Sequence, residues 1–386
     1  MLEGLEAVNW AALGHAGGSA EDLPWLLRQV RSADPKVREE TLRELFSTIV
    51  HQGTRYSATA PAVPFLVELA TAPDIHDRAW LVNLLAYAAV GNQQAALPDG
   101  IVSLDRLRYT TNWHEPEYAA WALAAYQAVQ ATLPALLPLV DDDEDRLRRE
   151  TAHLLAWFPS FAPVSLPHLR ARLPLETERD TRVTMIVAIG LLAGASGQTS
   201  DAPWLSELLA GPDAVLRWAA ATALARLAPE HPPEAAVQEL LGWLTDPPAS
   251  DSFALQANPD AFPCHDDMPF GEYTLLTLVR PGPAARRRVT EALLARLEGA
   301  SGRRAEGLVW ELMVVAFAGH PRAPRPLFAG LDPLQQRIVG ALARMPWSWQ
   351  APPGERIPAG GPLWAYGLAN TQQGLQAYVS DARPLG

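Results

Sequence analysis

The chain has 386 residues, of which 48% are hydrophobic and 19% are charged, an ordinary composition for a globular protein with a sizeable core. Its 31 basic and 43 acidic residues give a net charge of −12, which argues against nucleic acid or an anionic membrane as a partner. The single cysteine, Cys264, excludes an internal disulfide and a multi-cysteine metal site.

No leader sequence or membrane helix is expected from the sequence. The N-terminus lacks a basic start followed by an apolar stretch, as a signal peptide would have. The longest apolar run, Met185–Ala195, is much shorter than the roughly 18 residues that a membrane helix needs. We therefore expect a soluble, cytoplasmic protein without a membrane partner.

The apolar residues predict an all-α fold, because they recur at helical spacing and alternating strand patterns are almost absent. Within Val215–Ala228, for example, Leu216, Ala220, Ala223 and Leu227 fall on one face of a helix. Shorter helices are predicted to open near a proline, which a first helical turn tolerates. Their starts lie at Leu23-Pro24, Val63-Pro64, Leu133-Pro134 and Ala202-Pro203.

A longer second helix follows these shorter ones and carries an arginine near its start. Arg148, Arg182 and Arg217 recur at intervals of about 35 residues, the length of a two-helix repeat, and Arg38 aligns with Arg148. We expect these four arginines to occupy equivalent positions and to bond to the aspartates of neighbouring turns. An aspartate before each second helix is the predicted N-cap. Such a helix pair cannot bury its apolar face alone, so the pairs are expected to stack into an α-α superhelix.

The sequence pattern formed by Asp213, Arg217, Ala223 and Leu224 resembles the second helix of a HEAT repeat. The segment His51–Thr59, leading into Val63-Pro64-Phe65-Leu66, is also similar to bacterial HEAT-repeat proteins of uncharacterised function. The resemblance implies a HEAT-like solenoid of roughly seven or eight helix pairs over residues 1–346. HEAT arrays are mostly scaffolds and binding surfaces, so it implies a protein that binds another protein.

Three segments interrupt the repeat pattern. Insertions are predicted near residues 91–115 and 246–271, and connections of this length in a compact array are usually functional or disordered. The tail, residues 347–386, holds Trp349, Trp364 and Tyr366 among prolines and glycines. We expect this tail to cap the last repeat, whose apolar face would otherwise be exposed.

The candidate binding residues gather in three polar clusters. The first follows a helix that Gly53 is expected to end in a left-handed conformation. The other two lie in the insertions. The candidates are His51, Gln52, Tyr56, Thr59, Trp113, His114, Glu115, His265, Asp266 and Asp267. For each cluster a purely structural role stays open as the alternative, for example Asp266 or Asp267 capping a helix.

The sequence indicates no catalytic, metal or cofactor residues. His265 and Asp267 could face one ion only with distant partners, and neither a nucleophile elbow nor a phosphate-binding glycine loop is present. Thirteen tryptophans are present, of which Trp25, Trp204, Trp218 and Trp243 fall at predicted core positions. Exposed tryptophans on the concave face would instead mark a binding groove.

We expect a non-enzymatic scaffold or adaptor whose acidic concave surface attracts a basic protein, and an immunity-type inhibitor of a basic toxin is one such role. The alternative is a HEAT-like enzyme such as a DNA-repair glycosylase or a lyase. A glycosylase requires a basic groove, which the charge of −12 disfavours. The sequence does not determine the oligomeric state.

Overall fold

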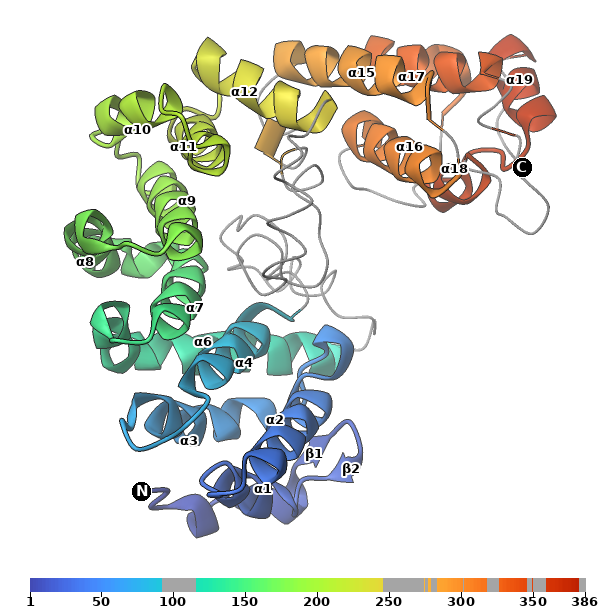
Figure 1. Ribbon diagram of the computed structural model, residues 1–386. Coiled ribbons are helices and arrows are strands. Elements are labelled where there is room, and N and C mark those ends of the chain that lie inside the picture. Colours follow the sequence, from blue (N-terminus) through green and yellow to red (C-terminus); the bar gives the residue numbers. More distant parts are fainter. Residues whose placement is uncertain are drawn as a thin grey trace. The chain divides into compact units, whose positions relative to one another are not determined.

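The computed structural model describes residues 1–91, 116–245, 274, 277–278, 283–300, 302–317, 326–345, 349 and 359–381. The chain divides into two compact units. Of the described residues, those up to Leu227 belong to the first unit and those from Ala228 onward belong to the second. Each unit is described by itself. Both consist of helices, apart from one short hairpin near the N-terminus (Figure 1).

The first unit begins with two turns of 3-10 helix, η1 (Leu5–Ala7) and η2 (Trp10–Ala12). A hairpin of two-residue strands follows, β1 (Gly14–His15) and β2 (Gly18–Ser19), which pair antiparallel. The indole nitrogen of Trp10 donates to the carbonyl oxygen of Leu5 at 2.8 Å, so the buried ring is hydrogen-bonded as burial requires.

Helix pairs make up the rest of the first unit. They are α1 (Leu23–Gln29) with α2 (Pro35–Ile49), α3 (Thr59–Thr71) with α4 (Arg78–Val90), α6 (Pro116–Leu136) with α7 (Asp145–Ala156), α8 (Ala162–Arg172) with α9 (Arg179–Ala195), and α10 (Ala202–Leu209) with α11 (Ala214–Leu227). Turns of 3-10 helix join some of them: η3 (His51–Gly53), η5 (Leu137–Asp141), η6 (Pro159–Phe161) and η7 (Leu173–Leu175).

Successive pairs stack in register within this unit. The second helices α4, α7, α9 and α11 pack one on the next and form one layer, while α3, α8 and α10 lie on the other side (Figure 1). The apolar faces meet between the layers, where Leu155, Ile189 and Trp218 are fully buried. The all-α fold and its HEAT-like stacking are therefore confirmed.

The second unit contains the helices α12 (Glu234–Thr245), α15 (Pro283–Leu297), α16 (Gly302–Phe317), α17 (Pro333–Arg344), α18 (Gly360–Ala365) and α19 (Gln372–Asp381), with a 3-10 turn, η9 (Phe328–Gly330). α17 starts with a capping box in which Asp332 accepts from the backbone of Gln335 and the Gln335 side chain accepts from the backbone of Asp332. Whether the array continues without a break to residue 346 stays a prediction.

The described helices of the tail lie against other helices of the second unit. α18 packs on α16, and α19 packs on α17. Tyr366 is buried and stacks on Phe317, and the indole of Trp349 donates to the carbonyl of Leu342 at 3.0 Å. Trp364, in contrast, is 60% exposed. The capping role of residues 347–386 as a whole stays a prediction.

Two predicted helix starts are wrong. Pro64 lies inside α3, which already begins at Thr59, and Pro134 lies near the end of α6. Each of these prolines removes one N–H donor from the helix. The neighbouring apolar residues are nevertheless buried, so packing overrides the preference of proline for the first helical turn. The predicted starts at Pro24 and Pro203 are confirmed, because both prolines stand in the first turn of their helix.

The helix caps also follow the prediction only in part. Asp34 and Asp213 accept backbone N–H groups at the starts of α2 and α11. Asp145 and Asp180 lie inside the first turns of α7 and α9, and the residues before these helices are glutamates without a side-chain cap bond. Gly53 has the expected left-handed conformation, with φ of 77°, but it ends η3 rather than α2.

Within the described residues, one segment is long and apolar enough to cross a membrane by length and composition alone. It is Glu117–Asp141, with a mean hydropathy of 1.3. α6, which forms most of it, packs against α3 and α4 and buries Ala122, Tyr126, Val129 and Leu133. This is the pattern of a core helix in a stacked array.

Candidate functional site

The predicted arginines occupy the same position in the first turn of their helices. The backbone N–H of each donates to the carbonyl four residues earlier, at 2.9–3.1 Å in Arg38, Arg148, Arg182 and Arg217. The guanidinium groups of Arg38, Arg148 and Arg217 each donate to the carbonyls five and six residues earlier. These arginines tie each second helix to the turn that precedes it.

Contacts between successive repeats involve the same groups. The Arg38 Nε donates to the Asp77 carboxylate at 3.0 Å, as expected for an aspartate of the neighbouring turn. Arg148 contacts Glu176 instead, with Nε to Oε2 at 2.6 Å and Nη2 to Oε1 at 2.9 Å. Arg182 departs from the expectation, since its guanidinium has no hydrogen bond within the described residues.

The N-terminal edge of the second-helix layer forms a groove between α2 and α4, with a cavity of about 370 Å³. It is lined by Pro35, Arg38, Glu39, Leu42, Arg43, Asp77 and Trp80. The ion pair of Arg38 and Asp77 fixes the distance between the two helices. Asp77 itself has a left-handed backbone, with φ of 59°, and stands at the N-cap of α4.

Trp80 is the aromatic residue of this groove. Its side chain is 39% exposed, and the guanidinium carbon of Arg146 lies 5.9 Å from the ring centroid, a cation–π distance. An exposed aromatic side chain that is held by a neighbour loses little conformational entropy when a partner covers it. Trp80 therefore has the properties of an anchor for a protein partner.

An acidic turn adjoins the groove at the start of α7. Asp141, Asp143, Glu144 and Asp145 are exposed. Asp142 is held by two hydrogen bonds from Arg78, at 2.8 and 2.9 Å. Burial raises the pKa of Asp142, but the bonds from Arg78 and the backbone of Glu144 outweigh it and lower the pKa below its ordinary value. The Asp142 carboxylate is thus favoured in its ionised form, and its bonds from Arg78 attach the turn to α4.

A row of buried polar side chains continues along α4 and α7. Asn83 donates to Glu150 at 3.1 Å, and the Arg149 guanidinium lies 3.9 Å from the same carboxylate. His153 accepts a weak bond from the Trp157 indole at 3.4 Å. Buried polar groups are costly unless paired, so this row fixes the spacing of the two helices. The sequence did not single it out, although these α7 residues stand at helical spacing.

The structure shows different environments for the first predicted cluster. His51 and Gln52 are exposed, and Tyr56 is half-buried beside Tyr118, with ring centroids 6.4 Å apart. Burial raises the pKa of Tyr56, and the neighbouring Tyr118 raises it further. Thr59 is fully buried, and its hydroxyl donates to the Ile49 carbonyl at 2.7 Å, joining α3 to the end of α2.

The other candidates lie outside the described residues. They are Trp113, His114, Glu115, His265, Asp266 and Asp267. Their role in binding stays a prediction. Among the described residues, no group of three or more His, Cys, Asp or Glu side chains is arranged to hold a metal ion.

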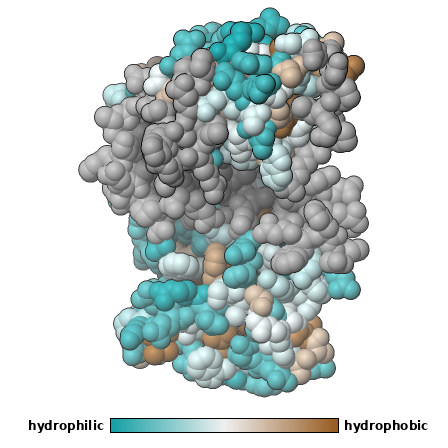
Figure 2. Space-filling model, turned by 90° about the vertical axis from the view of Figure 1, so that its right-hand side faces the viewer, coloured by the Kyte–Doolittle hydropathy of each residue, from teal (hydrophilic) through white to brown (hydrophobic). Residues whose placement is uncertain are grey.

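The tryptophans are placed only partly as predicted. Trp218 and Trp243 are buried as expected, whereas Trp204 is half-buried and Trp25 is 59% exposed. Trp25 shows that a repeat position alone does not determine burial. On the face shown in Figure 2, the described surface is mostly hydrophilic, and its hydrophobic residues form small separate patches. A single exposed aromatic side chain such as Trp80 is therefore more informative than any broad apolar area.

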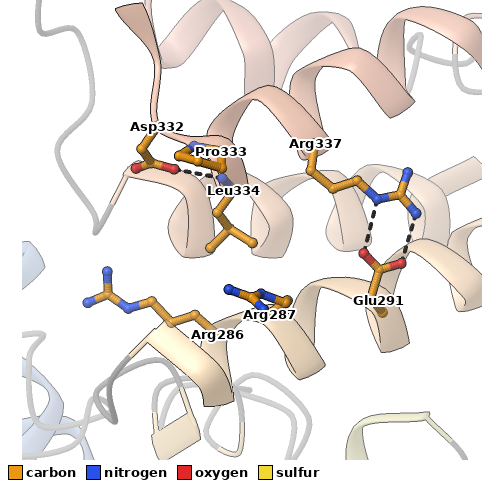
Figure 3. A pocket seen from close by; sticks show the side chains of 7 residues that line it. All are labelled: Arg286, Arg287, Glu291, Asp332, Pro333, Leu334 and Arg337. Carbon is orange, nitrogen blue, oxygen red and sulfur yellow. Dashed lines mark hydrogen bonds and ion pairs between the residues drawn. The ribbon is translucent and has the colours of Figure 1, made fainter.

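A second hollow, of about 530 Å³, lies in the second unit between α15 and α17. Arg286 and Arg287 on α15 face Asp332, Pro333 and Leu334 at the start of α17 (Figure 3). The Arg337 side chain reaches across to Glu291, with two bonds of 3.0 and 2.8 Å (Figure 3). This pair bridges the two helices, and Arg288 likewise pairs with Glu234 on α12 at 2.8 Å.

The stacked helix pairs define an α-solenoid. Residues 103–190 match the family model of HEAT repeats, which confirms the resemblance to HEAT repeats for this part of the chain. The similarity to bacterial HEAT-repeat proteins stays a prediction. No curated protein matches the chain. HEAT arrays present extended surfaces to other proteins, so the match indicates a protein-interaction scaffold in general terms.

Proposed function

We propose that the protein is a non-enzymatic scaffold that binds a basic partner protein through the Trp80 groove and the acidic turn beside it. The observation that carries this proposal is the position of Trp80. It is 39% exposed on the second-helix layer, is contacted by Arg146, and lies in a groove fixed by the Arg38–Asp77 ion pair. Aromatic anchors in preformed grooves contribute most of the binding energy of protein interfaces.

The acidic turn supports a partner of positive charge. Four exposed carboxylates lie within five residues of chain, and the fifth carboxylate, of Asp142, is neutralised by Arg78. Charge complementarity of this kind accelerates association and selects against acidic partners. An immunity-type inhibitor of a basic toxin is the narrower form of the same proposal. The proposal also includes a cytoplasmic location and the absence of membrane and nucleic-acid partners.

Replacing Trp80 by alanine should weaken partner binding at least tenfold, about 1.4 kcal/mol, because the anchor is removed. The partner would be captured from the native host with the wild-type chain and its affinity measured by calorimetry. Trp25→Ala is the matched control, since Trp25 is more exposed but lies on α1, the first helix of its pair. Equal loss of binding in both variants would contradict the proposed groove.

Neutralising the acidic turn should slow association without changing the fold. The triple variant Asp141→Asn, Asp143→Asn and Glu144→Gln removes three exposed charges. We expect the association rate to fall about tenfold at low salt and the difference to shrink near 0.15 M salt, because surface charges are screened there. Stopped-flow measurements over a salt series test this. A rate that is unchanged at low salt would exclude a basic partner at this turn.

A further inference from the structure

A cavity of about 610 Å³ lies on the first unit between α8, α9 and α10. Its lining is mainly apolar, and the fully buried Ile186 and Ile189 on α9 contribute to it. Trp204 on α10 and Leu173 in η7 add to this surface and are half-buried. The volume falls within the range of pockets that hold small organic molecules.

The charged side chains that line this cavity are hydrogen-bonded, except for one basic and one acidic residue. Asp201 accepts from Arg170 Nε at 3.1 Å and Nη2 at 2.6 Å, and from the Trp204 indole at 3.0 Å. Arg170 also donates to Gln198 at 3.0 Å. These groups neutralise one another. Arg182 and the exposed Glu207 remain as the charged lining residues whose side chains have no hydrogen bond within the described part of the chain.

Arg182 is the exception among the arginines of the repeat. Arg38, Arg148 and Arg217 have the same backbone position and direct their guanidinium groups to the carbonyls of the preceding turn. Arg182 has this backbone position as well, yet it lines the cavity, and its Nε is buried without an acceptor. A buried donor without an acceptor is costly, so such a group indicates a missing partner.

We propose that this cavity binds a small apolar carboxylate, with the carboxylate bonded to Arg182 and the apolar body against Ile186, Ile189 and Trp204. A guanidinium group binds a carboxylate with two parallel hydrogen bonds, and a low-dielectric surrounding strengthens them. An aromatic ring of the ligand would stack on the Trp204 indole. This site is separate from the Trp80 groove and does not depend on the proposed scaffold function.

The probe is 4-phenylbutyrate, and the neutral and cationic analogues are 4-phenylbutan-1-ol and 4-phenylbutylamine. Isothermal calorimetry and saturation-transfer NMR on the full chain should detect the acid, with the alcohol at least tenfold weaker and the amine weaker still. The reason is that only the acid supplies acceptors to Arg182. The Glu207→Gln variant should bind the acid at least as tightly as the wild type, because the substitution removes a negative charge that repels the carboxylate of the ligand.

Arg182→Met should reduce binding of the acid at least tenfold and leave the thermal midpoint unchanged or higher. Arg217→Met is the matched control, with the same change at the same position of the next repeat. It should lower the midpoint, since Arg217 donates to the Gly211 and Pro212 carbonyls, and leave binding intact. The proposal is overturned if Arg182→Met binds as the wild type does. It is also overturned if the amine binds as well as the acid, or if the wild type binds no acid up to about 5 mM.

Discussion

Replacing Glu176 by glutamine should destabilise the first unit by about 3–5 kcal/mol, because it breaks a buried ion pair and leaves the Arg148 charge without its partner. The side chains of Glu176 and Arg148 are only 0% and 7% exposed. The carboxylate also accepts the backbone N–H groups of Thr177 and Glu178, both at 3.0 Å. It therefore joins α7 to the turn that begins α9, and urea unfolding followed by circular dichroism measures the loss.

The control for this variant is Glu291→Gln in the second unit. Glu291 also holds an arginine with two bonds, but the side chains of Glu291 and Arg337 are 52% and 47% exposed. Water screens such a pair, so we expect a loss of about 0–1 kcal/mol. Equal effects of the two substitutions would show that burial does not determine the strength of the Glu176 pair.

The same pair predicts a pH dependence. Burial raises the pKa of Glu176, but the hydrogen bonds from Arg148 and the Glu178 backbone and the positive charges of Arg148 and Arg172 together outweigh burial and lower the pKa below its ordinary value. The ionised form is therefore favoured by folding. The stabilisation is fully present above the unfolded-state pKa of about 4.3 and is lost as the pH falls through the lower folded-state pKa. The difference in the free energy of unfolding between the wild type and Glu176→Gln should therefore decrease as the pH falls below about 4.3.

Replacing Gly190 by alanine should cost about 2–3 kcal/mol, the upper end of the range for overpacking in a core. A Cβ atom at Gly190 would lie 2.5 Å from both the Cα and the Cβ of Ala223 on α11. One turn further on, a Cβ at Gly194 would lie 2.2 Å from the Arg226 carbonyl oxygen. The two glycines let α9 and α11 approach closely, so the substitution must push the helices apart.

The opposite result is expected for Gly307→Ala on α16. Gly307 is exposed, and a Cβ there would meet nothing within 4 Å. Alanine should therefore stabilise its helix by about 0.5–1 kcal/mol through its higher helix propensity. Thermal unfolding of both variants provides the measurement. If Gly190→Ala left the stability unchanged or raised it, α9 and α11 would be able to move apart without a loss of stability.

The sequence predicted the arginine positions well and their partners less well. Arg148, Arg182 and Arg217 were aligned from their spacing and Arg38 from the similarity of its segment to that of Arg148, and the structure places all four at the same position in their helices. Their partners were predicted only in part. Arg38 bonds to Asp77, an aspartate of the neighbouring turn as expected, whereas Arg148 bonds to Glu176, 28 residues away, where an aspartate was expected. Likewise, Trp25 and Trp218 both stand at repeat positions, but only Trp218 is buried.

By itself, the sequence determined the all-α class, the pairing of helices and the family of the repeat. These properties depend on apolar periodicity and on first-turn arginines, which are local patterns within one helix. The tertiary structure alone decided the close approach of α9 to α11, the groove beside Trp80 and the cavity at Arg182. Each of these arises where two or three repeats meet, and helical periodicity identifies the face of a helix but not the side chains that will lie opposite it.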